Sequence, residues 1–506
     1  MKTLGIDIGS SFIKAFIYDT DQGKCIARCQ VPGQEMPITV LYPGWAGQSP
    51  EMWWENARKA LKGVISLSTD SAKDIRAIGI TYQMHGLVCL DKAGNPLGDS
   101  IIWCDSRAVG TGNMLADMLG QDYCRQHLLN SPGNFTASKL KWLMENQPSV
   151  YEKVFRIMLP GDYIAYRLTG EMNTTPCGLS EGIFWDFAED RVSERLLEVS
   201  GISGELLPAI VPVFGFQGKV LPEIAEDLGI PAGTPVTYRA GDQPNNAFSL
   251  NVMEPGELAA TAGTSGVVYG VTDRMISDLQ NRINTFAHVN HTRENPRLGV
   301  LLCINGTGIM NSWVRKILGN GVDYEKMNAE AMQIMPGTDG LMVLPFLNGA
   351  ERMLNNRDIG GNIYGMDFNK HGKSHFFRAV QEGIAFAFRY GIDIMKEIGI
   401  VPSVIRAGNA NMFLSPLFRQ FLADVCHVTI DLYETDGATG AAIGAAVGAG
   451  NCNTYEKAFS GIKKIKMVDP SDECEKMTEY YFKWKDLLET TLIESERLKK
   501  YEHYTR

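Results

Sequence analysis

The sequence predicts an α/β protein built from two related domains, and three observations support this prediction. The chain has 506 residues, which is more than one hydrophobic core usually organises. Segments with the pattern of strands alternate with segments of helical periodicity along the whole chain. A strand–turn–strand pattern near the amino terminus recurs near the middle. We therefore predict two domains, at residues 1–249 and 250–506.

The first half begins with short segments that are rich in β-branched residues and bounded by turns, which is typical of strands. They cover residues 4–8, 12–18, 75–82 and 88–90. Between them, Ser49, Pro50 and Glu51 supply an N-cap, a proline at the first helical position and an acidic first turn. Apolar residues then recur at helical spacing through residue 64, and do so again at 377–395, so both segments are predicted helices.

Two predicted hairpins resemble each other, LGIDIGSSFIKAFIYD at 4–19 and LAATAGTSGVVYGV at 258–271. Their tips carry glycine and hydroxyl side chains, which expose N–H and O–H donors with little bulk and therefore suit a phosphate. One such tip alone is better explained as an ordinary turn. A tip that opens each half favours a duplicated domain with phosphates held between the copies. Neither a GxxxxGK[ST] loop nor a GxGxxG fingerprint lies at a strand–helix junction.

Composition and charge exclude some classes of protein. The hydrophobic fraction of 44% and charged fraction of 21% are typical of a soluble globular protein, and the net charge of −10 disfavours binding to nucleic acid or to an anionic membrane. The ten cysteines are scattered without a Cys-x-x-Cys pair, so we expect reduced thiols in a cytoplasmic protein. Asp7 interrupts the apolar run that a signal peptide would need. The Ala/Gly-rich segment 437–450 is short for a membrane span and predicts a helix packed closely against a neighbour.

The segment RAGDQPNN, residues 239–246, places a carboxylate between a predicted strand at 234–238 and a predicted helix at 245–250. The dipole at the start of that helix favours the ionised form of Asp242. One interpretation is that Asp242 only caps the helix. The other is that it acts as a general base toward an attacking hydroxyl. These residues alone leave both interpretations open.

Over essentially its whole length the sequence resembles the FGGY family of carbohydrate kinases. The resemblance rests on GIDIGSSFIKA at 5–15, GWAGQSPEMWW at 44–54, YQMHGLVCLD at 82–91, IIWCDSR at 101–107, RAGDQPNNA at 239–247, TAGTSG at 261–266 and RAGNANMFLSPLFRQFLAD at 406–424. The pair QMHG and WCDSR is the most discriminating and is most similar to the members that phosphorylate D-xylulose. The resemblance implies a duplicated ribonuclease H-like fold of the actin and hexokinase type, with an interdomain cleft.

The resemblance also implies a catalytic centre. Asp242 aligns with the family's catalytic base, and Asp7 aligns with an aspartate that lies near Mg²⁺, so we expect Asp7 and Asp242 at the metal. Mg²⁺ keeps most of its waters and prefers one or two carboxylates plus phosphates, so two facing aspartates are sufficient. The alternative for Asp7 is that it only stabilises the turn that follows it.

For the nucleotide, the resemblance implies contacts from both hairpin tips and from two later loops: Ser10, Ser11, Lys14, Gly263, Thr264, Gly308, Ser312, Gly408 and Asn409. Lys14 could equally be a solvated strand lysine, and Asn409 a turn former. The family often shows a longer glycine run near residue 408, which leaves individual adenine contacts open.

For the sugar, the resemblance implies contacts from Met84, His85, Asp105, Asp242 and Gln243. A histidine can donate or accept according to its tautomer, whereas a carboxylate is a fixed acceptor. We expect Arg107 to orient Asp105 or a nearby loop, and Trp103 to form part of a wall, with simple packing as the alternative for both. Many relatives carry asparagine at position 243, which leaves open whether the longer Gln243 side chain contacts a sugar hydroxyl.

The implied reaction is ATP- and Mg²⁺-dependent phosphorylation of a ketopentose, with the 5-hydroxyl of D-xylulose as the expected acceptor. Ribulose, fuculose, rhamnulose and gluconate are alternative substrates. A non-catalytic sugar sensor on the same fold is a second alternative, and an actin-like filament has less support. We expect no nucleic-acid or membrane partner; a homodimer is compatible with the sequence, although no motif indicates one.

Overall fold

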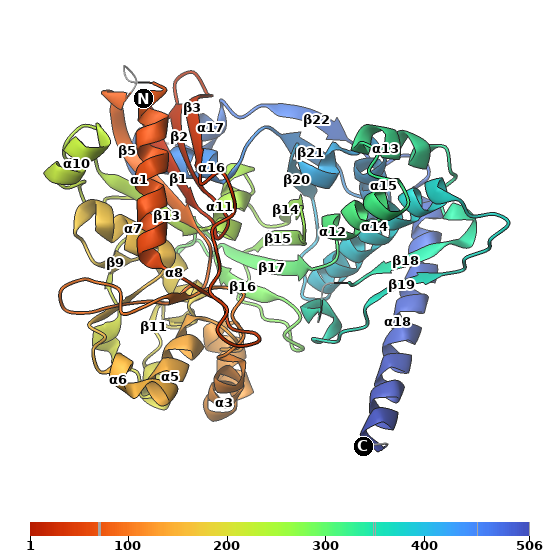
Figure 1. The fold of residues 1–506 in the computed structure, drawn as a ribbon, viewed down its shortest axis with the longest axis horizontal. Helices are drawn as coiled ribbons and strands as arrows, with labels where there is room; N and C mark the ends of the chain where they lie inside the picture. The colour runs from red at the N-terminus through yellow and green to blue at the C-terminus, as the bar shows by residue number, and fades with distance from the viewer. Residues whose placement is uncertain (69–71, 348, 350, 453, 505–506) are drawn as a thin grey trace.

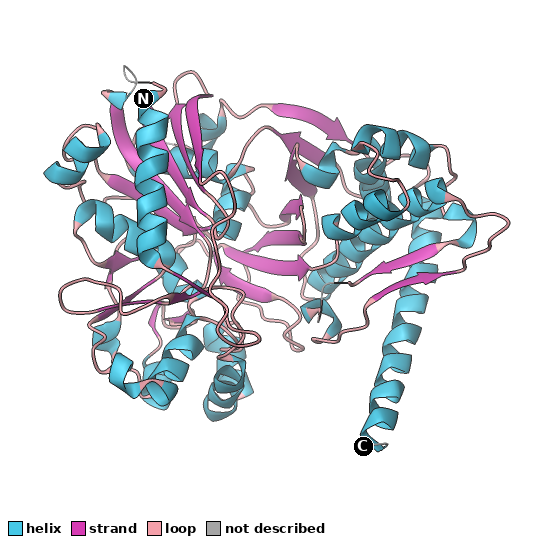
Figure 2. Ribbon diagram, in the orientation of Figure 1, coloured by secondary structure: helices cyan, strands magenta, loops and turns pink. Residues whose placement is uncertain are grey.

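The computed structural model describes residues 1–68, 72–347, 349, 351–452 and 454–504. It consists of two sheet-and-helix halves that lie side by side, the first coloured red to yellow-green and the second green to blue (Figure 1). Helices flank both sheets (Figure 2). The predicted α/β class is confirmed.

The first half is built on a five-stranded sheet with the order β13-β5-β1-β2-β3. The strands are β1 Lys2–Ile8, β2 Ile13–Asp19, β3 Lys24–Val31, β5 Ile75–Tyr82 and β13 Val236–Gly241. β1 is antiparallel to β2 but parallel to β5, which is parallel to β13. The carboxyl ends of β1, β5 and β13 therefore meet at one edge of this sheet.

The second half is built on a seven-stranded sheet with the order β16-β17-β15-β14-β20-β21-β22. Its strands are β14 Glu257–Ala262, β15 Gly266–Thr272, β16 Asn284–Ala287, β17 Leu298–Ile304, β20 Val404–Gly408, β21 Ile430–Tyr433 and β22 Lys464–Val468. The β14-β15 hairpin occupies the place of β1-β2, with β17 antiparallel beside β15 and β20 parallel beside β14. The two hairpins recognised in the sequence are thus equivalent elements of a duplicated unit.

The helices and short strands complete the two halves. The principal helices are α1 Pro50–Ser66, α3 Val109–Leu119, α5 Thr136–Asn146, α7 Pro160–Thr169, α8 Pro176–Glu181, α9 Glu194–Ser200, α10 Pro222–Leu228, α11 Asp242–Ser249, α12 Gly308–Ile317, α13 Tyr324–Met332, α14 Lys373–Glu397, α15 Pro416–Cys426, α16 Gly437–Gly448, α17 Tyr455–Phe459 and α18 Cys474–Tyr504. Short two-stranded sheets pair β4 Gly47–Gln48 with β7 Ser100–Ile101, β6 Val88–Leu90 with β8 Arg156–Met158, β9 Asn173–Thr174 with β12 Ala209–Ile210, β10 Trp185–Asp186 with β11 Arg191–Val192, and β18 Met342–Pro345 with β19 Gly361–Tyr364. In α1 the Ser49 hydroxyl accepts a hydrogen bond from the backbone N–H of Met52, as expected of an N-cap.

Helix α16 belongs to the second half of the sequence but packs on strands β1, β5 and β13 of the first sheet. Glycines make this close approach possible. A Cβ atom on Gly5 would lie 2.0 Å from the carbonyl oxygen of Ala438, and one on Gly79 would lie 1.9 Å from that of Ala441. The expectation that this Ala/Gly-rich helix packs closely against a neighbour is confirmed.

Side chains of the first half form hydrogen bonds with the backbone at the outer edge of β16. The side-chain amide of Asn130 donates to the carbonyl of Thr285 at 2.5 Å, and its oxygen accepts from the N–H of Thr285 at 3.0 Å. The Ser180 hydroxyl accepts from the N–H of Ala287 at 3.0 Å. These bonds satisfy backbone groups that an edge strand would otherwise expose and so join the two halves.

The ten cysteines all lie within the described residues and are free thiols. No helix among the described residues is both long enough and apolar enough to cross a membrane.

We predict that Gly79→Ala destabilises the protein by about 1–3 kcal/mol, because the added methyl group must push α16 away from the sheet. Gly110→Ala is the control, since Gly110 lies in α3 with no atom near the position of an added Cβ. Alanine there should be neutral or slightly stabilising. Urea denaturation of both variants measures the difference, and equal midpoints would contradict the packing described for α16.

A second prediction concerns acid stability. His288 is fully buried between the Tyr269 hydroxyl and the Val252 carbonyl, and burial lowers its pKa to about 3. Because this pKa lies below the unfolded value of about 6.5, the stabilisation is complete above pH 6.5 and is lost as the pH falls toward 3. In His288→Gln, the drop in free energy of unfolding between pH 6 and pH 5 should be smaller by about 1 kcal/mol. An unchanged pH dependence in urea titrations would show that His288 is not buried in its neutral form.

Candidate active site

The edge where β1, β5 and β13 end carries the predicted catalytic residues. Asp7 lies one residue before the end of β1 and pairs in register with Thr81 of β5. Met84 and His85 follow β5, and Asp242 follows β13 directly. Parallel strands bring their carboxyl ends to the same edge, so residues separated by more than 200 positions become neighbours here.

Asp242 is the first residue of α11, and the N-cap position belongs to Gly241. The helix therefore begins three residues earlier than predicted. It accommodates Pro244 because a proline in the first turn removes no helical hydrogen bond. The capping interpretation of Asp242 does not fit this geometry. Its carboxyl group lies at the positive end of the helix dipole, and the neighbouring N–H groups of Gln243 act to lower its pKa.

The carboxyl groups of Asp242 and Asp7 lie close enough for the charge of Asp7 to act on Asp242. Burial and the charge of Asp7 raise the pKa of Asp242 to about 7. Burial also raises the pKa of Asp7 to about 6, with Lys14 acting to lower it and Asp436 to raise it further. The ammonium nitrogen of Lys14 is 3.8 Å from the Asp7 carboxylate. Two partly buried carboxyl groups with raised pKa values, one raised further by the charge of the other, fit a hydrated Mg²⁺ ion, which would relieve the repulsion between them.

Met84 and His85 border this centre on the side of the first half. A Cβ atom on Gly241 would lie 2.5 Å from Cγ of Met84, so the Met84 side chain packs against the backbone that carries Asp242. The ring of His85 lies 4.6 Å from that of Phe135 and 5.5 Å from that of Phe286. Phe286 belongs to β16, so His85 lies where the two halves meet.

Asp105 does not fit its predicted role as a direct sugar ligand. Its carboxylate is fully buried and accepts from the N–H of Ala46 at 2.5 Å and from the guanidinium of Arg107 at 2.7 and 2.8 Å. The Arg107 guanidinium lies over the ring of Trp45 at 3.9 Å. Both carboxylate oxygens are occupied, since the second accepts from the N–H of Arg107. Asp105 and Arg107 therefore form the expected pair, but the pair anchors the loop around Ala46. Trp103 is largely exposed.

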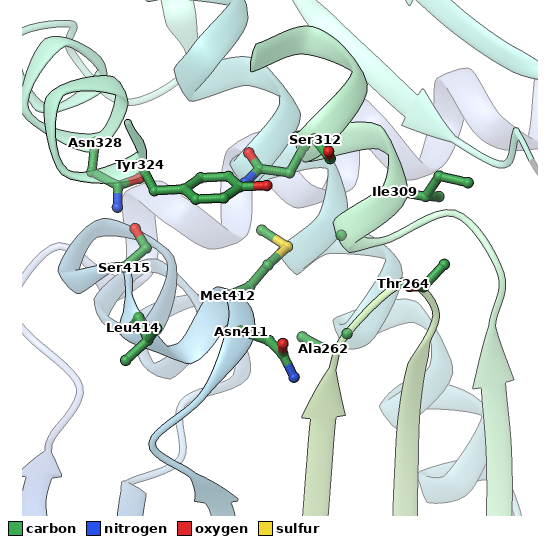
Figure 3. A pocket seen from close by; sticks show the side chains of 13 residues that line it. Ala262, Thr264, Ile309, Ser312, Tyr324, Asn328, Asn411, Met412, Leu414 and Ser415 are labelled. Carbon is green, nitrogen blue, oxygen red and sulfur yellow. The ribbon is translucent and has the colours of Figure 1, made fainter. Parts of the chain in front are cut away.

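The second half contains a pocket of about 480 Å³ next to its hairpin tip. The tip, the start of α12, the start of α13 and the loop after β20 line it: Ala262, Gly263, Thr264, Gly308, Ile309, Asn311, Ser312, Tyr324, Asn328, Asn411, Met412, Leu414 and Ser415. In Figure 3 the Tyr324 ring extends across the pocket toward Ser312, and Met412 lies below it. Four predicted nucleotide residues, Gly263, Thr264, Gly308 and Ser312, are thus brought together.

The hairpin tip docks on the first turn of α12. The carbonyl of Gly263 accepts from the N–H of Gly308 at 2.9 Å and from the Thr307 hydroxyl at 3.1 Å. A Cβ atom on Gly308 would lie 2.2 Å from the Gly263 oxygen. Only glycine allows this contact, and the exposed Thr264 next to it lines the pocket.

Gly408 and Asn409 are not among the lining residues. Gly408 ends β20, and the N–H of Asn409 donates to the Tyr433 carbonyl at 2.9 Å, so this backbone is still held by the sheet. From the same loop, Asn411 and Met412 line the pocket. Ser10 and Ser11 form the tip of the first hairpin beyond Asp7, where their carbonyls accept from Gln48 and Met36.

Sequence reasoning missed the residues that surround His85: Phe135, Lys139, Glu181 and Phe286. Lys139 had a recognisable signal, because it interrupts an otherwise apolar stripe with Phe135 and Leu143 at helical spacing of four. Glu181 and Phe286 gave none, since each belongs to an ordinary helix or strand pattern.

Two family models match the chain. The N-terminal domain of the FGGY family of carbohydrate kinases matches residues 2–249, and the C-terminal domain of the same family matches residues 258–450. The chain therefore belongs to the FGGY family of carbohydrate kinases, and it is a carbohydrate kinase.

Individual relatives narrow the comparison. The xylulose kinase of Escherichia coli (strain K12) is 29% identical over 448 residues, which are 88% of each chain. That of Bacillus subtilis (strain 168) is 28% identical over 464 residues, 90% of this chain and 89% of the relative. Among solved structures, the xylulose kinase from Rhodospirillum rubrum has a TM-score of 0.86 and 24% identity over 97% of this chain and 99% of the other. Plasmodium falciparum glycerol kinase with ADP has a TM-score of 0.86 and 22% identity over 97% and 98%. These structures confirm the predicted fold.

We predict that Gly308→Ala weakens nucleotide binding about tenfold, which corresponds to about 1.4 kcal/mol. The methyl group would separate the hairpin tip from α12 and so misplace the donors at the pocket mouth. Calorimetric titration with ADP measures the effect. Gly33→Ala, at an exposed position without close neighbours, is the control and should bind ADP as the wild type does. Unchanged affinity in Gly308→Ala would place the nucleotide elsewhere.

Proposed function

We propose that this kinase transfers the terminal phosphate of ATP to the 5-hydroxyl of D-xylulose. The observation that carries the proposal is the meeting of Asp242 and Asp7 at the end of the first sheet, beside Met84 and His85. The relatives named as xylulose kinases cover 88% of this chain at 28–29% identity and support the choice of sugar. The proposed domains are residues 1–249 for the sugar and 250–506 for the nucleotide.

Asp242 is the proposed general base. A sugar hydroxyl is a weak nucleophile while neutral, and a carboxylate within hydrogen-bond reach accepts its proton as the bond to phosphorus forms. A base works best when its pKa lies near the operating pH, and the pKa of Asp242 is raised to about 7.

Asp7 and Asp242 are the proposed residues for Mg²⁺. When bound, the ion supplies positive charge against the phosphate oxygens of ATP. The two carboxylates would hold the hydrated ion at the end of β1, and Lys14 beside Asp7 would add a cation toward the phosphates. Ser10 and Ser11, at the tip that follows Asp7, are proposed phosphate donors from the first half.

The pocket of the second half is the proposed nucleotide site. Gly263 and Thr264 at the hairpin tip, together with Gly308 and Ser312 of α12, would face the phosphates. Gly408 and Asn409 would support the loop whose later residues contact the adenosine. The sugar would lie against Met84, His85 and Gln243, close to the base.

Replacement of the base tests the mechanism. We predict that Asp242→Asn lowers kcat for D-xylulose at least 100-fold, because general-base catalysis contributes about 10²- to 10⁴-fold. Asp122→Asn is the control, since the Asp122 side chain is exposed in its short helix, and it should keep full activity. The measurement is steady-state release of ADP with saturating ATP and Mg²⁺. A turnover in Asp242→Asn close to that of the wild type would remove Asp242 from the mechanism.

Product identification tests the substrate. With ATP and Mg²⁺, mass spectrometry should show a singly phosphorylated pentulose from D-xylulose. D-ribulose, L-fuculose, L-rhamnulose and D-gluconate should give kcat/KM values at least tenfold lower. A higher kcat/KM for any of these would reassign the sugar, and binding of all sugars without a phosphorylated product would contradict the kinase reaction itself.

A further inference from the structure

The backbone of His85 is held in an unusual conformation. Its φ is +63°, in the left-handed region that side chains other than those of glycine, asparagine and aspartate rarely adopt. Such a conformation persists only where the surroundings hold it in place. The residues that do so here were not predicted to act in the reaction.

Lys139 and Thr136 of α5 hold the carbonyl oxygen of His85. The ammonium nitrogen of Lys139 donates to this oxygen at 2.8 Å and to the carbonyl of Ile102 at 3.0 Å. The Thr136 hydroxyl donates to the same His85 oxygen at 3.2 Å. Lys139 is fully buried. The loop after β5 is thus fixed from the protein interior by a buried amine.

Glu181, at the end of α8, holds the other side of His85. Its carboxylate accepts from the backbone N–H of His85 at 3.5 Å, and its carbonyl oxygen lies 2.9 Å from Nδ1 of the ring. A second carboxylate oxygen of Glu181 packs at Gly241, next to Asp242. One residue therefore contacts both the histidine and the strand end that carries the proposed base.

These contacts determine the tautomer of the ring. A carbonyl oxygen can only accept, so Nδ1 must carry the proton in its bond to Glu181. Burial, with the charge of Lys139, lowers the pKa of His85 to about 3, so the ring is neutral at pH 7. In a neutral ring protonated at Nδ1, the other nitrogen, Nε2, is a hydrogen-bond acceptor.

We propose that Lys139 is a positioning residue that holds His85 in the place where Glu181 fixes its tautomer, so that Nε2 accepts a hydrogen bond from a hydroxyl of the sugar. This inference rests on the proposed function for the identity of the ligand. It adds that the site selects a substrate with an O–H donor at this point and disfavours one that offers only an acceptor, such as an ether or carboxylate oxygen.

A buried lysine suits this task although it is costly to bury. Burial lowers the pKa of Lys139 to about 7, with Asp105 acting in the opposite direction. A neutral amine still has two N–H groups, which are enough for the carbonyls of His85 and Ile102. An apolar side chain at this position would leave both buried carbonyls without this donor. The arrangement thus holds in either protonation state of Lys139.

Kinetics provide the first test. Lys139→Met should raise KM for D-xylulose at least tenfold while KM for ATP stays within twofold of the wild type. Lys141→Met is the matched control, because Lys141 lies on the same helix and pairs with the exposed Glu145. Thr136→Val, which removes one donor to the same carbonyl with little change in volume, should raise KM for D-xylulose about threefold. Equal changes in both KM values, or none in either variant, would overturn the proposal.

Nitrogen NMR of histidine-labelled protein provides a second test that does not depend on turnover. The His85 signals are assigned by their loss in His85→Gln. In the wild type at pH 7 we expect a proton on Nδ1 and none on Nε2, and in Thr136→Val and Lys139→Met a mixture of both tautomers. A proton on Nε2 in the wild type would overturn the inference.

The two tests separate the two proposals. If the wild type phosphorylates none of the sugars but shows the Nδ1 tautomer, which Thr136→Val disturbs, the proposed substrate fails and the positioning role stands. If D-xylulose is phosphorylated but the tautomer is the other one, the positioning role fails alone. If Lys139→Met does not fold, the Thr136→Val variant and the wild-type NMR spectrum still test the positioning role.

Discussion

The structure depends on the parallel register of β1, β5 and β13, which brings three loop starts to one edge of the first sheet. The carboxyl groups of Asp7 and Asp242 both lie there. Burial raises the pKa of both, and the charge of Asp7 raises that of Asp242 further. Such an arrangement is unfavourable for an isolated protein and becomes favourable when a cation binds. The fold thus places two carboxylates at this edge that favour the binding of a cation, and the proposed reaction supplies one with ATP.

The two halves are joined by packing that leaves little room for substitution. Helix α16 crosses from the second half onto the first sheet, where glycines bring its backbone against β1 and β5. On the other side, Asn130 and Ser180 pair the edge of β16, whose Phe286 reaches the ring of His85. Each half therefore contributes atoms to the surroundings of the other, and both shape the surroundings of His85, the proposed sugar side of the site.

Much of the fold could be predicted from local patterns. Both glycine-tipped hairpins, the capped helix at Pro50 and the close-packed helix at Gly437 follow from spacing and small residues, and the structure confirms them. The family resemblance pointed to Asp7 and Asp242, which the structure brings to one sheet edge, and to the loops that line the pocket of the second half. It could not show that the Asp105 carboxylate accepts hydrogen bonds from Arg107 and Ala46. Nor could it show that the backbone at Asn409 is bonded to β21, because such pairings depend on distant chain segments. The contacts of Glu181 with His85 and Gly241 likewise form only when α8 packs against β13.

The central claim is that Asp242 faces the attacking sugar hydroxyl while Asp7 and Asp242 share the metal ion of the nucleotide. A crystal structure with D-xylulose, ADP and Mg²⁺ tests it most directly. The account predicts the sugar's 5-oxygen at about 2.6–3.2 Å from the Asp242 carboxylate, with Mg²⁺ held between both aspartates and the phosphates. A sugar bound away from Asp242, or a metal ion held without either aspartate, would contradict it.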